Sequence, residues 1–143
     1  MKAALPVMLL MLATAGCQTS NATGPAPGPE GSASMVRLEG NATYRQRIAL
    51  PPDAVLIVRI QDVSRMDAPA RLIAEQRLPT QGRQVPLPFA VDYDPAQVQS
   101  VPRVAVSARI EDGAGTLLWI TDTHIPLPPA GQRVDLPLVQ VSR

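Results

Sequence analysis

Apolar and polar residues alternate along much of the chain after residue 35, and this period of two predicts β-strands. Residues 42–50 (ATYRQRIAL) set Tyr44, Ile48 and Leu50 against a polar side that carries two arginines. Residues 54–60 (AVLIVRI) are almost continuously apolar and rich in β-branched side chains, which is typical of a central strand. Further strands are predicted at residues 71–78, 85–91, 103–111, 116–122 and 132–141.

Proline and glycine indicate where the strands end and which of them lie at an edge. Pro86 and Pro88 cannot donate a backbone hydrogen bond, so the strand over 85–91 belongs at the edge of a sheet. Pro137 indicates an edge or a bulge in the last strand. Residues 111–116 (EDGAGT) predict a hairpin turn through their Asp-Gly pair and a second glycine.

Residues 92–101 (DYDPAQVQSV) have room for one helical turn, because Asp94 can cap it and Pro95 suits the first helical position. The spacing of the other elements predicts an all-β fold of about seven or eight short, mostly antiparallel strands. A small β-sandwich and a small barrel both fit this spacing, and we favour the sandwich, over residues 36–143. Trp119 is its best core anchor.

The first seventeen residues, MKAALPVMLLMLATAGC, have the layout of a secretory signal peptide over residues 1–16. Lys2 precedes an apolar run that is too short for a comfortable transmembrane helix. The sequence TAGC resembles the bacterial lipobox, with Ala15 and Gly16 at the small positions and Thr14 where the pattern usually has Leu. The resemblance implies lipidation of Cys17. An ordinary signal peptide followed by a stray cysteine is the alternative.

Residues 17–35 predict a disordered, lipidated tether, because their Gly, Pro, Ala and Ser residues cannot bury enough apolar surface to fold. In the enteric lipoproteins that this segment resembles, Asp after the lipidated cysteine retains the protein in the inner membrane. Gln18 stands at that place and favours the outer membrane. We therefore expect a lipid-anchored protein of the cell envelope, in the inner leaflet of the outer membrane and facing the periplasm.

Composition argues against several classes of function. Lys2 is the only lysine among thirteen basic residues, so the chain without residues 1–16 has twelve arginines against twelve acidic residues. A neutral chain with four aromatic residues offers neither an electrostatic footprint for nucleic acid nor a stacking platform. Cys17 is the only cysteine, which excludes an intramolecular disulfide. We expect no cofactor and no small-molecule substrate.

The segment QDVSRMDAPA, residues 61–70, gathers Asp, Ser and Arg side chains and raises the question of an active site. Ser64 would need a general base, and no feature of the sequence pairs it with His124, the only histidine. Asp62 and Ser64 suit a turn in which short polar side chains bond the local backbone. We predict a connection between two strands at this segment, and no enzymatic activity.

Asp92 and Asp94 are the best candidates for a metal site. They stand two apart, so on a strand both carboxylates point the same way and a weak calcium site is conceivable. A turn followed by a helix cap explains the same pair. We favour the cap, and we predict no metal site.

Six short motifs distinguish the body of the chain: Leu50-Pro51-Pro52, Asp53-Ala54, Asp62-Val63-Ser64, Ala68-Pro69-Ala70, Pro86-x-Pro88-Phe89 and Tyr93-Asp94. With them, the body from roughly Leu38 to Val141 resembles the YbaY family of bacterial lipoproteins, which is related to the YscW-type lipoprotein chaperones of type III secretion. The segment SVPRVAVSARI departs from the family, which often has an aromatic residue there. The resemblance implies a membrane-tethered β-sandwich without catalysis. YscW-type members act as pilots that help a secretin reach and assemble in the outer membrane.

Two functions follow as hypotheses. The first is a non-catalytic binding or assembly-chaperone module for an envelope protein such as a secretin, held at the membrane through lipidated Cys17. The second is a passive structural or stress-related envelope lipoprotein without a dedicated partner. A secretin gene beside this gene would favour the first hypothesis, and a solitary locus would favour the second.

Overall fold

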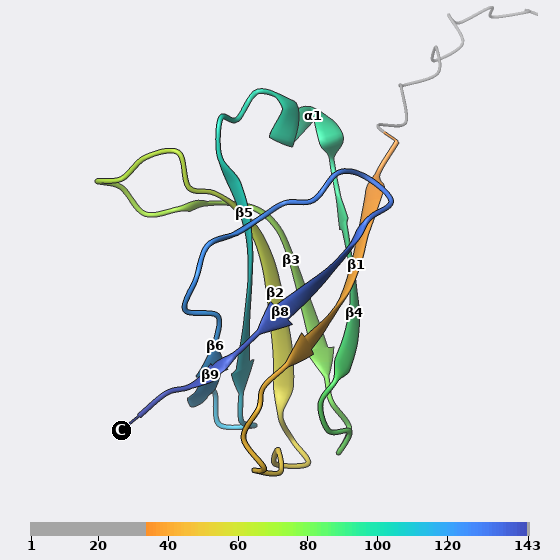
Figure 1. Cartoon of the computed structure of the whole chain (residues 1–143), viewed down its shortest axis with the longest axis vertical. Helices are drawn as coiled ribbons and strands as arrows, with labels where there is room; N and C mark the ends of the chain where they lie inside the picture. The colour runs from red at the N-terminus through yellow and green to blue at the C-terminus, as the bar shows by residue number, and fades with distance from the viewer. Residues whose placement is uncertain (1–33, 143) are drawn as a thin grey trace, which may run out of the picture. The chain divides into compact units, whose positions relative to one another are not determined.

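The computed structural model describes residues 34–142, so the predicted signal peptide, Cys17 and most of the predicted tether lie outside the described residues. The described part forms two β-sheets and one short helix (Figure 1). This confirms the all-β sandwich, and two of the nine strands are only two residues long. The elements are β1 (Val36–Thr43), β2 (Val55–Asp62), β3 (Arg71–Pro79), β4 (Leu87–Tyr93), α1 (Pro95–Gln99), β5 (Val104–Glu111), β6 (Leu117–Ile120), β7 (Ile125–Pro126), β8 (Arg133–Pro137) and β9 (Val139–Gln140).

The smaller sheet has the strand order β4-β1-β8, and the larger has the order β3-β2-β5-β6-β9 with β7 paired to β5. Every pair is antiparallel except β1 with β8, which run parallel. β4 is an edge strand, as its prolines predicted. β8 is the opposite edge, and Pro137 ends it where the chain leaves for the other sheet.

The core lies between the sheets and uses one alternating face of each long strand. β4 shows the alternation most clearly, because Leu87, Phe89, Val91 and Tyr93 are all buried while the residues between them are more exposed. Each large apolar side chain removed from water contributes roughly 1.5–3 kcal/mol, so this layer is the main source of stability. Other large members of the core are Leu38, Leu56, Val58, Ile60, Val106, Ile110, Trp119, Leu136 and Leu138.

Short-range signals in the sequence are confirmed where the structure tests them. Asp94 caps α1, and its Oδ1 accepts the N–H of Ala96 at 2.9 Å. The hairpin between β5 and β6 is held by Asp112, whose Oδ1 accepts the N–H groups of Ala114 and Thr116. In both places an Asp side chain bonds a backbone N–H within four residues. The cap was predicted from Asp94 and Pro95, and the hairpin from its Asp-Gly pair and second glycine, which are all local signals.

The strand predicted over residues 42–50 is wrong beyond Thr43, where β1 ends and an irregular loop begins. Tyr44 turns into the core and stacks on Trp119, with ring centroids 3.8 Å apart and an interplanar angle of 6°. Its hydroxyl donates a hydrogen bond to the Ile48 carbonyl at 2.6 Å, which closes the loop on itself. Leu50 is buried, while Ile48 is 46% exposed. The alternating apolar residues that predicted a strand therefore belong to a folded loop.

The preceding strand, β1, carries residues with weak strand propensity, and no local pattern of residues indicates its importance. It is nevertheless the central strand of the smaller sheet. A Cβ on Gly40 would lie 2.0 Å from the carbonyl oxygen of Val134 on β8 and 2.6 Å from the ring of Phe89 on β4. Glycine is therefore required where β1 meets both of its neighbours.

Replacing Gly40 with Ala should destabilise the sandwich by about 1–3 kcal/mol, because the new methyl group overlaps the backbone of β8 and cannot be absorbed by a rotamer change. Denaturant unfolding monitored by circular dichroism would measure the loss. Glu39→Ala on the same strand is the control, since its exposed pair with Arg133 contributes at most about 1 kcal/mol. Equal stability of Gly40→Ala and wild type would contradict the close approach of β1 and β8.

Replacing Trp119 with Ala should cost about 3–5 kcal/mol, because the side chain is 2% exposed and its removal leaves a cavity and an unstacked Tyr44. The free energy of unfolding, from urea titration, is the measurement. Met66→Ala serves as the matched control, because Met66 is 90% exposed and should change stability by less than about 0.5 kcal/mol. A loss below about 1 kcal/mol for Trp119→Ala would mean that the stack does not anchor the core.

Candidate interaction surface on the outer face of the larger sheet

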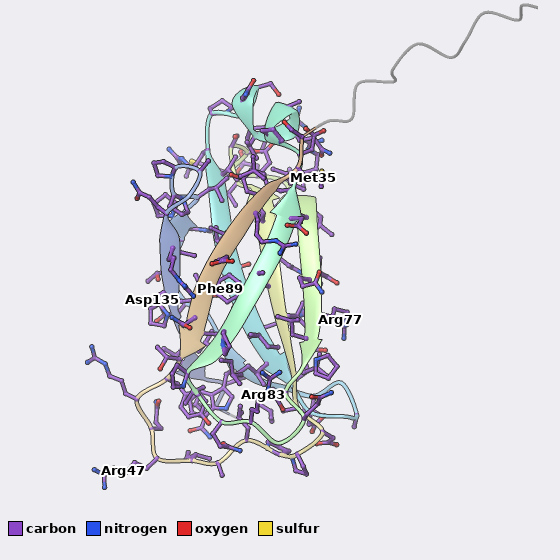
Figure 2. The ribbon with its side chains drawn as sticks, turned by 90° about the vertical axis from the view of Figure 1, so that its right-hand side faces the viewer. Met35, Arg47, Arg77, Arg83, Phe89 and Asp135 are labelled. Atoms are coloured by element: carbon purple, nitrogen blue, oxygen red, sulfur yellow. The ribbon has the colours of Figure 1, made fainter. Side chains whose placement is uncertain are left out.

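The face of the larger sheet that points away from the core is unusually well covered. Ile57 on β2 points to this face, outside the main core cluster, and still has no exposed surface. Its partners across the sheet are Arg77 on β3 and Arg109 on β5, so two long side chains share its face and flank it. Figure 2 shows Arg77 on the outer strand β3. The outer face therefore has a small second layer of packing.

A chain of ion pairs crosses this layer over three neighbouring strands. Arg59 on β2 pairs with Glu75 on β3 at 2.5 Å, and Arg109 on β5 pairs with Glu111 at 2.9 Å. Arg77 links the two pairs, at 3.8 Å from Glu75 and 3.5 Å from Glu111. Isolated surface ion pairs contribute little to the free energy of folding. We therefore interpret this chain of pairs as holding the long side chains in place over Ile57. Sequence reasoning missed it, although Glu75 with Arg77 and Arg109 with Glu111 are spaced two apart.

A groove lies on the same face, beside the ion pairs and toward the end of the sheet that carries the β2–β3 connection. Its wider part has a volume of about 630 Å³, and its narrower part has a volume of about 270 Å³. The two parts share four lining residues, so they form one continuous depression: Val63, Ala70, Ala105 and His124. Two of these residues, Ala70 and Ala105, have small side chains, which leaves room at the centre of the face.

One wall of the groove is the β2–β3 connection, which projects from the body in Figure 1 as a yellow-green loop. The Ser64 hydroxyl accepts the N–H of Arg103 at 3.2 Å, and the Val63 N–H donates to the carbonyl of Arg103 at 3.0 Å. Asp62 accepts the backbone N–H of Ser64 at 2.9 Å. Hydrogen bonds from the side chain and the backbone of Ser64 hold the pKa of Asp62 below its usual value.

The prediction of a strand connection with locally satisfied polar groups is therefore confirmed for this segment. Ser64 is tied to the start of β5, and its hydroxyl has Arg103 as its hydrogen-bond partner. His124 lies in the segment that forms the other side of the groove, as a lining residue. Ser64 is not itself a lining residue, but its neighbours Val63 and Arg65 line the same groove as His124, a proximity that their separation in the sequence concealed.

The other wall is the segment between β6 and β7, and it is also tied to β5. Thr121 bonds Ala108 through both its backbone and its side chain: its N–H donates to the Ala108 carbonyl at 2.9 Å, and its Oγ1 accepts the Ala108 N–H at 2.6 Å. The N–H of Leu127 donates to the Val104 carbonyl at 3.1 Å. One wall is therefore bonded to β5 and the other to Arg103, the residue just before β5, so the groove is preformed.

The carboxylates considered for a metal site have structural partners. Asp92 receives two hydrogen bonds from Arg37, at 2.8 and 3.0 Å, and these hold the pKa of Asp92 below its usual value. Asp94 caps α1. Within residues 34–142 no group of three or more His, Cys, Asp or Glu side chains is placed to hold a metal ion. In that same range no helix is long and apolar enough to cross a membrane.

Comparison with known proteins places this fold. A solved structure described as an alternative pilotin from the type II secretion system of Vibrio cholerae superposes with a TM-score of 0.70 at 45% sequence identity, covering 76% of this chain and 99% of that one. The lipoprotein YbaY of Escherichia coli (strain K12) is 34% identical over 147 residues, which span 95% of this chain and 77% of the relative.

A family model described as type III secretion system lipoprotein chaperone (YscW) matches residues 33–138, which is most of the chain. These matches confirm the resemblance to the YbaY and YscW lipoproteins that the short motifs indicated. The structural match also agrees with the two-sheet sandwich described above. The chain belongs to the YscW family of secretion-system lipoprotein chaperones.

Proposed function

We propose that this chain is a lipid-anchored, non-catalytic assembly chaperone of the cell envelope, and that its partner is a secretin-type protein. The observation that carries the proposal is the match to the Vibrio cholerae pilotin, which combines 45% identity with coverage of 99% of that chain. Identity at this level, over a whole domain, is a stronger basis for shared function than a shared β-sandwich, because one fold serves many functions.

The proposed anchor is Cys17, at the end of a signal-like segment and followed by a Gly- and Pro-rich stretch. Gln18 supports the outer membrane as the destination, since the retention signal of the enteric lipoproteins that the segment resembles is Asp at this position. Bacterial lipidation adds several acyl chains, and each buried methylene contributes about 0.8 kcal/mol. Several chains therefore anchor a protein where one chain binds only reversibly. The body would then face the periplasm.

The described body supports binding in preference to chemistry. The polar side chains with candidate catalytic or metal roles are engaged in structural hydrogen bonds or caps, as described for Ser64, Asp92 and Asp94. The groove, by contrast, is a concave surface with an apolar lining and rigid walls. Ligand and peptide sites in proteins commonly have these properties.

The Cys17→Ser variant should lose incorporation of a palmitate analogue in growing cells and should move from the membrane fraction to the soluble fraction. Serine has no thiol to accept the lipid, so the apolar chains that hold the protein at the bilayer are absent. Ser20→Ala, three residues further along, is the matched control and should label and fractionate like wild type. Equal labelling of Cys17→Ser and wild type would end the proposal of a lipid anchor.

Deleting the gene should lower the amount of assembled secretin in the outer-membrane fraction several-fold, as measured by immunoblotting of heat-resistant multimers. The full chain should restore it, and Cys17→Ser should not, because an unanchored chaperone cannot deliver its partner to the membrane. An unrelated outer-membrane protein, probed on the same blot, should stay constant. Unchanged secretin after deletion would favour a passive envelope lipoprotein over a chaperone.

A further inference from the structure

The wider part of the groove has a distinct chemical lining. It is apolar over most of its area, through residues such as Val63, Met66, Ala105 and Pro126. Two arginines, Arg65 and Arg103, line it as well, and no Asp or Glu does. Apolar walls with cations and no anions are complementary to a ligand that is itself partly apolar and negatively charged.

The two arginines differ from those of the neighbouring ion-pair chain. Arg59 and Arg109 line the narrower part, and each is neutralised by a glutamate within 3 Å. Among residues 34–142, neither Arg65 nor Arg103 has a carboxylate within the 4 Å of an ion pair. Both residues are exposed. Arg65 also interacts with the charge of Asp62, but neither arginine is held in an ion pair within the described residues, so both guanidinium groups are available to an incoming group.

Met66 stands between the apolar lining and the solvent. It lies in the β2–β3 connection next to Arg65, lines the groove and is 90% exposed. Methionine is flexible and polarisable, and it adapts to side chains of different shape. An apolar partner would cover Met66, which is otherwise the most exposed large hydrophobic residue of the described chain.

We propose that this groove binds a short segment of a partner polypeptide in which apolar side chains stand next to acidic ones. The apolar side chains would occupy the hollow above Ala105 and contact Met66, and the carboxylates would pair with Arg65 and Arg103. The inference rests on the proposed function, because it names where the protein partner of that function binds and which residue types it presents. Walls already fixed to β5 need little ordering on binding, which favours affinity from a small contact.

A polypeptide segment fits these features better than an anionic membrane surface. The groove is concave and is bordered by two walls, so a flat bilayer would meet the walls and not the lining. Met66 is also the only large hydrophobic among the lining residues of the wider part that is mostly exposed, and a single such residue gives weak membrane insertion.

The test is selection of a phage-displayed library of random twelve-residue peptides on the full chain, purified in mild detergent. Selected peptides should be enriched in Asp and Glu together with Leu, Ile, Val or Phe, relative to the unselected library. Synthetic copies should bind less tightly as salt rises, because exposed charge pairs are screened. No enrichment, or enrichment of basic or purely polar sequences, would overturn the proposal.

Variants then place the binding on the molecule. Arg65→Glu and Arg103→Glu reverse a charge on exposed side chains, and each should weaken the selected peptides by about tenfold or more. Ala105→Leu fills the hollow and should weaken them whatever their charge. Arg47→Glu is the matched control, because Arg47 projects from the loop after β1 at the far end of the body from α1, and it should bind like wild type (Figure 2).

Thermal unfolding of each variant distinguishes a loss of binding from a loss of folding. If Ala105→Leu fails to fold, the test of the proposal is the affinity of Arg103→Glu, whose substituted side chain is exposed. Unchanged affinity in Arg65→Glu and Arg103→Glu would place the peptides elsewhere and end the proposal. Binding to vesicles containing 30% phosphatidylglycerol that Met66→Asp abolishes, without any selected peptide, would assign the surface to lipid instead.

Co-purification of the secretin with wild-type chain keeps this inference distinct from the proposed function. If wild type retains the secretin and Arg103→Glu retains it equally well, the groove is not the docking site although the chaperone proposal stands. If wild type does not retain the secretin, the chaperone proposal fails, while the peptide selection still decides whether the groove recognises acidic, apolar segments.

Discussion

The two sheets of this protein depend on one junction, where the last strand passes from one sheet to the other. β8 pairs with β1 in the smaller sheet, and two residues later β9 pairs with β6 in the larger. Leu138, between them, is buried, and its N–H donates to the carbonyl of Thr43 at 2.8 Å. The residue that follows the end of β1 is Tyr44, which stacks on Trp119 of β6. The first and last strands of the described residues are therefore held together by contacts in the core.

This junction also explains how a protein with so few aromatic residues closes a sandwich. Tyr44 and Trp119 are both buried members of the core and stack on each other, and burial raises the pKa of the Tyr44 hydroxyl. In the larger sheet, β2 and β5 are both interior strands. Their outer face then needs a cover of its own, which the ion pairs supply at one end and the groove's walls supply at the other.

How far the sequence predicted this structure depends on the range of each interaction. β2, β3 and β5 were predicted nearly to the residue, since a continuous apolar run or a strict alternation is a local signal. The prolines of β4 and the cap at Asp94 were local as well. β1 was missed because Gly40 suits close packing against Val134, about ninety positions away, and contributes nothing to strand propensity.

The candidate site was harder to predict than the fold, for the same reason. The segment around Ser64 was correctly interpreted as a strand connection, because Asp62 and Ser64 bond locally. That it forms one wall of a groove requires Arg103 and His124, which come from two other parts of the chain. The ion pairs require the register of three strands. Neither arrangement leaves a contiguous motif.

A small preformed groove suits a chaperone that acts at a membrane surface. A hollow of about 630 Å³ holds only a few side chains, so the contact that we propose is small. Weak binding is useful when the partner must be released into its final assembly. The proposed lipid anchor compensates for it, because two molecules confined to one bilayer meet at a higher effective concentration than in free solution. In this arrangement the lipid anchor brings the two proteins together and the groove recognises the partner. The groove therefore does not need to bind so tightly that it would retain the partner.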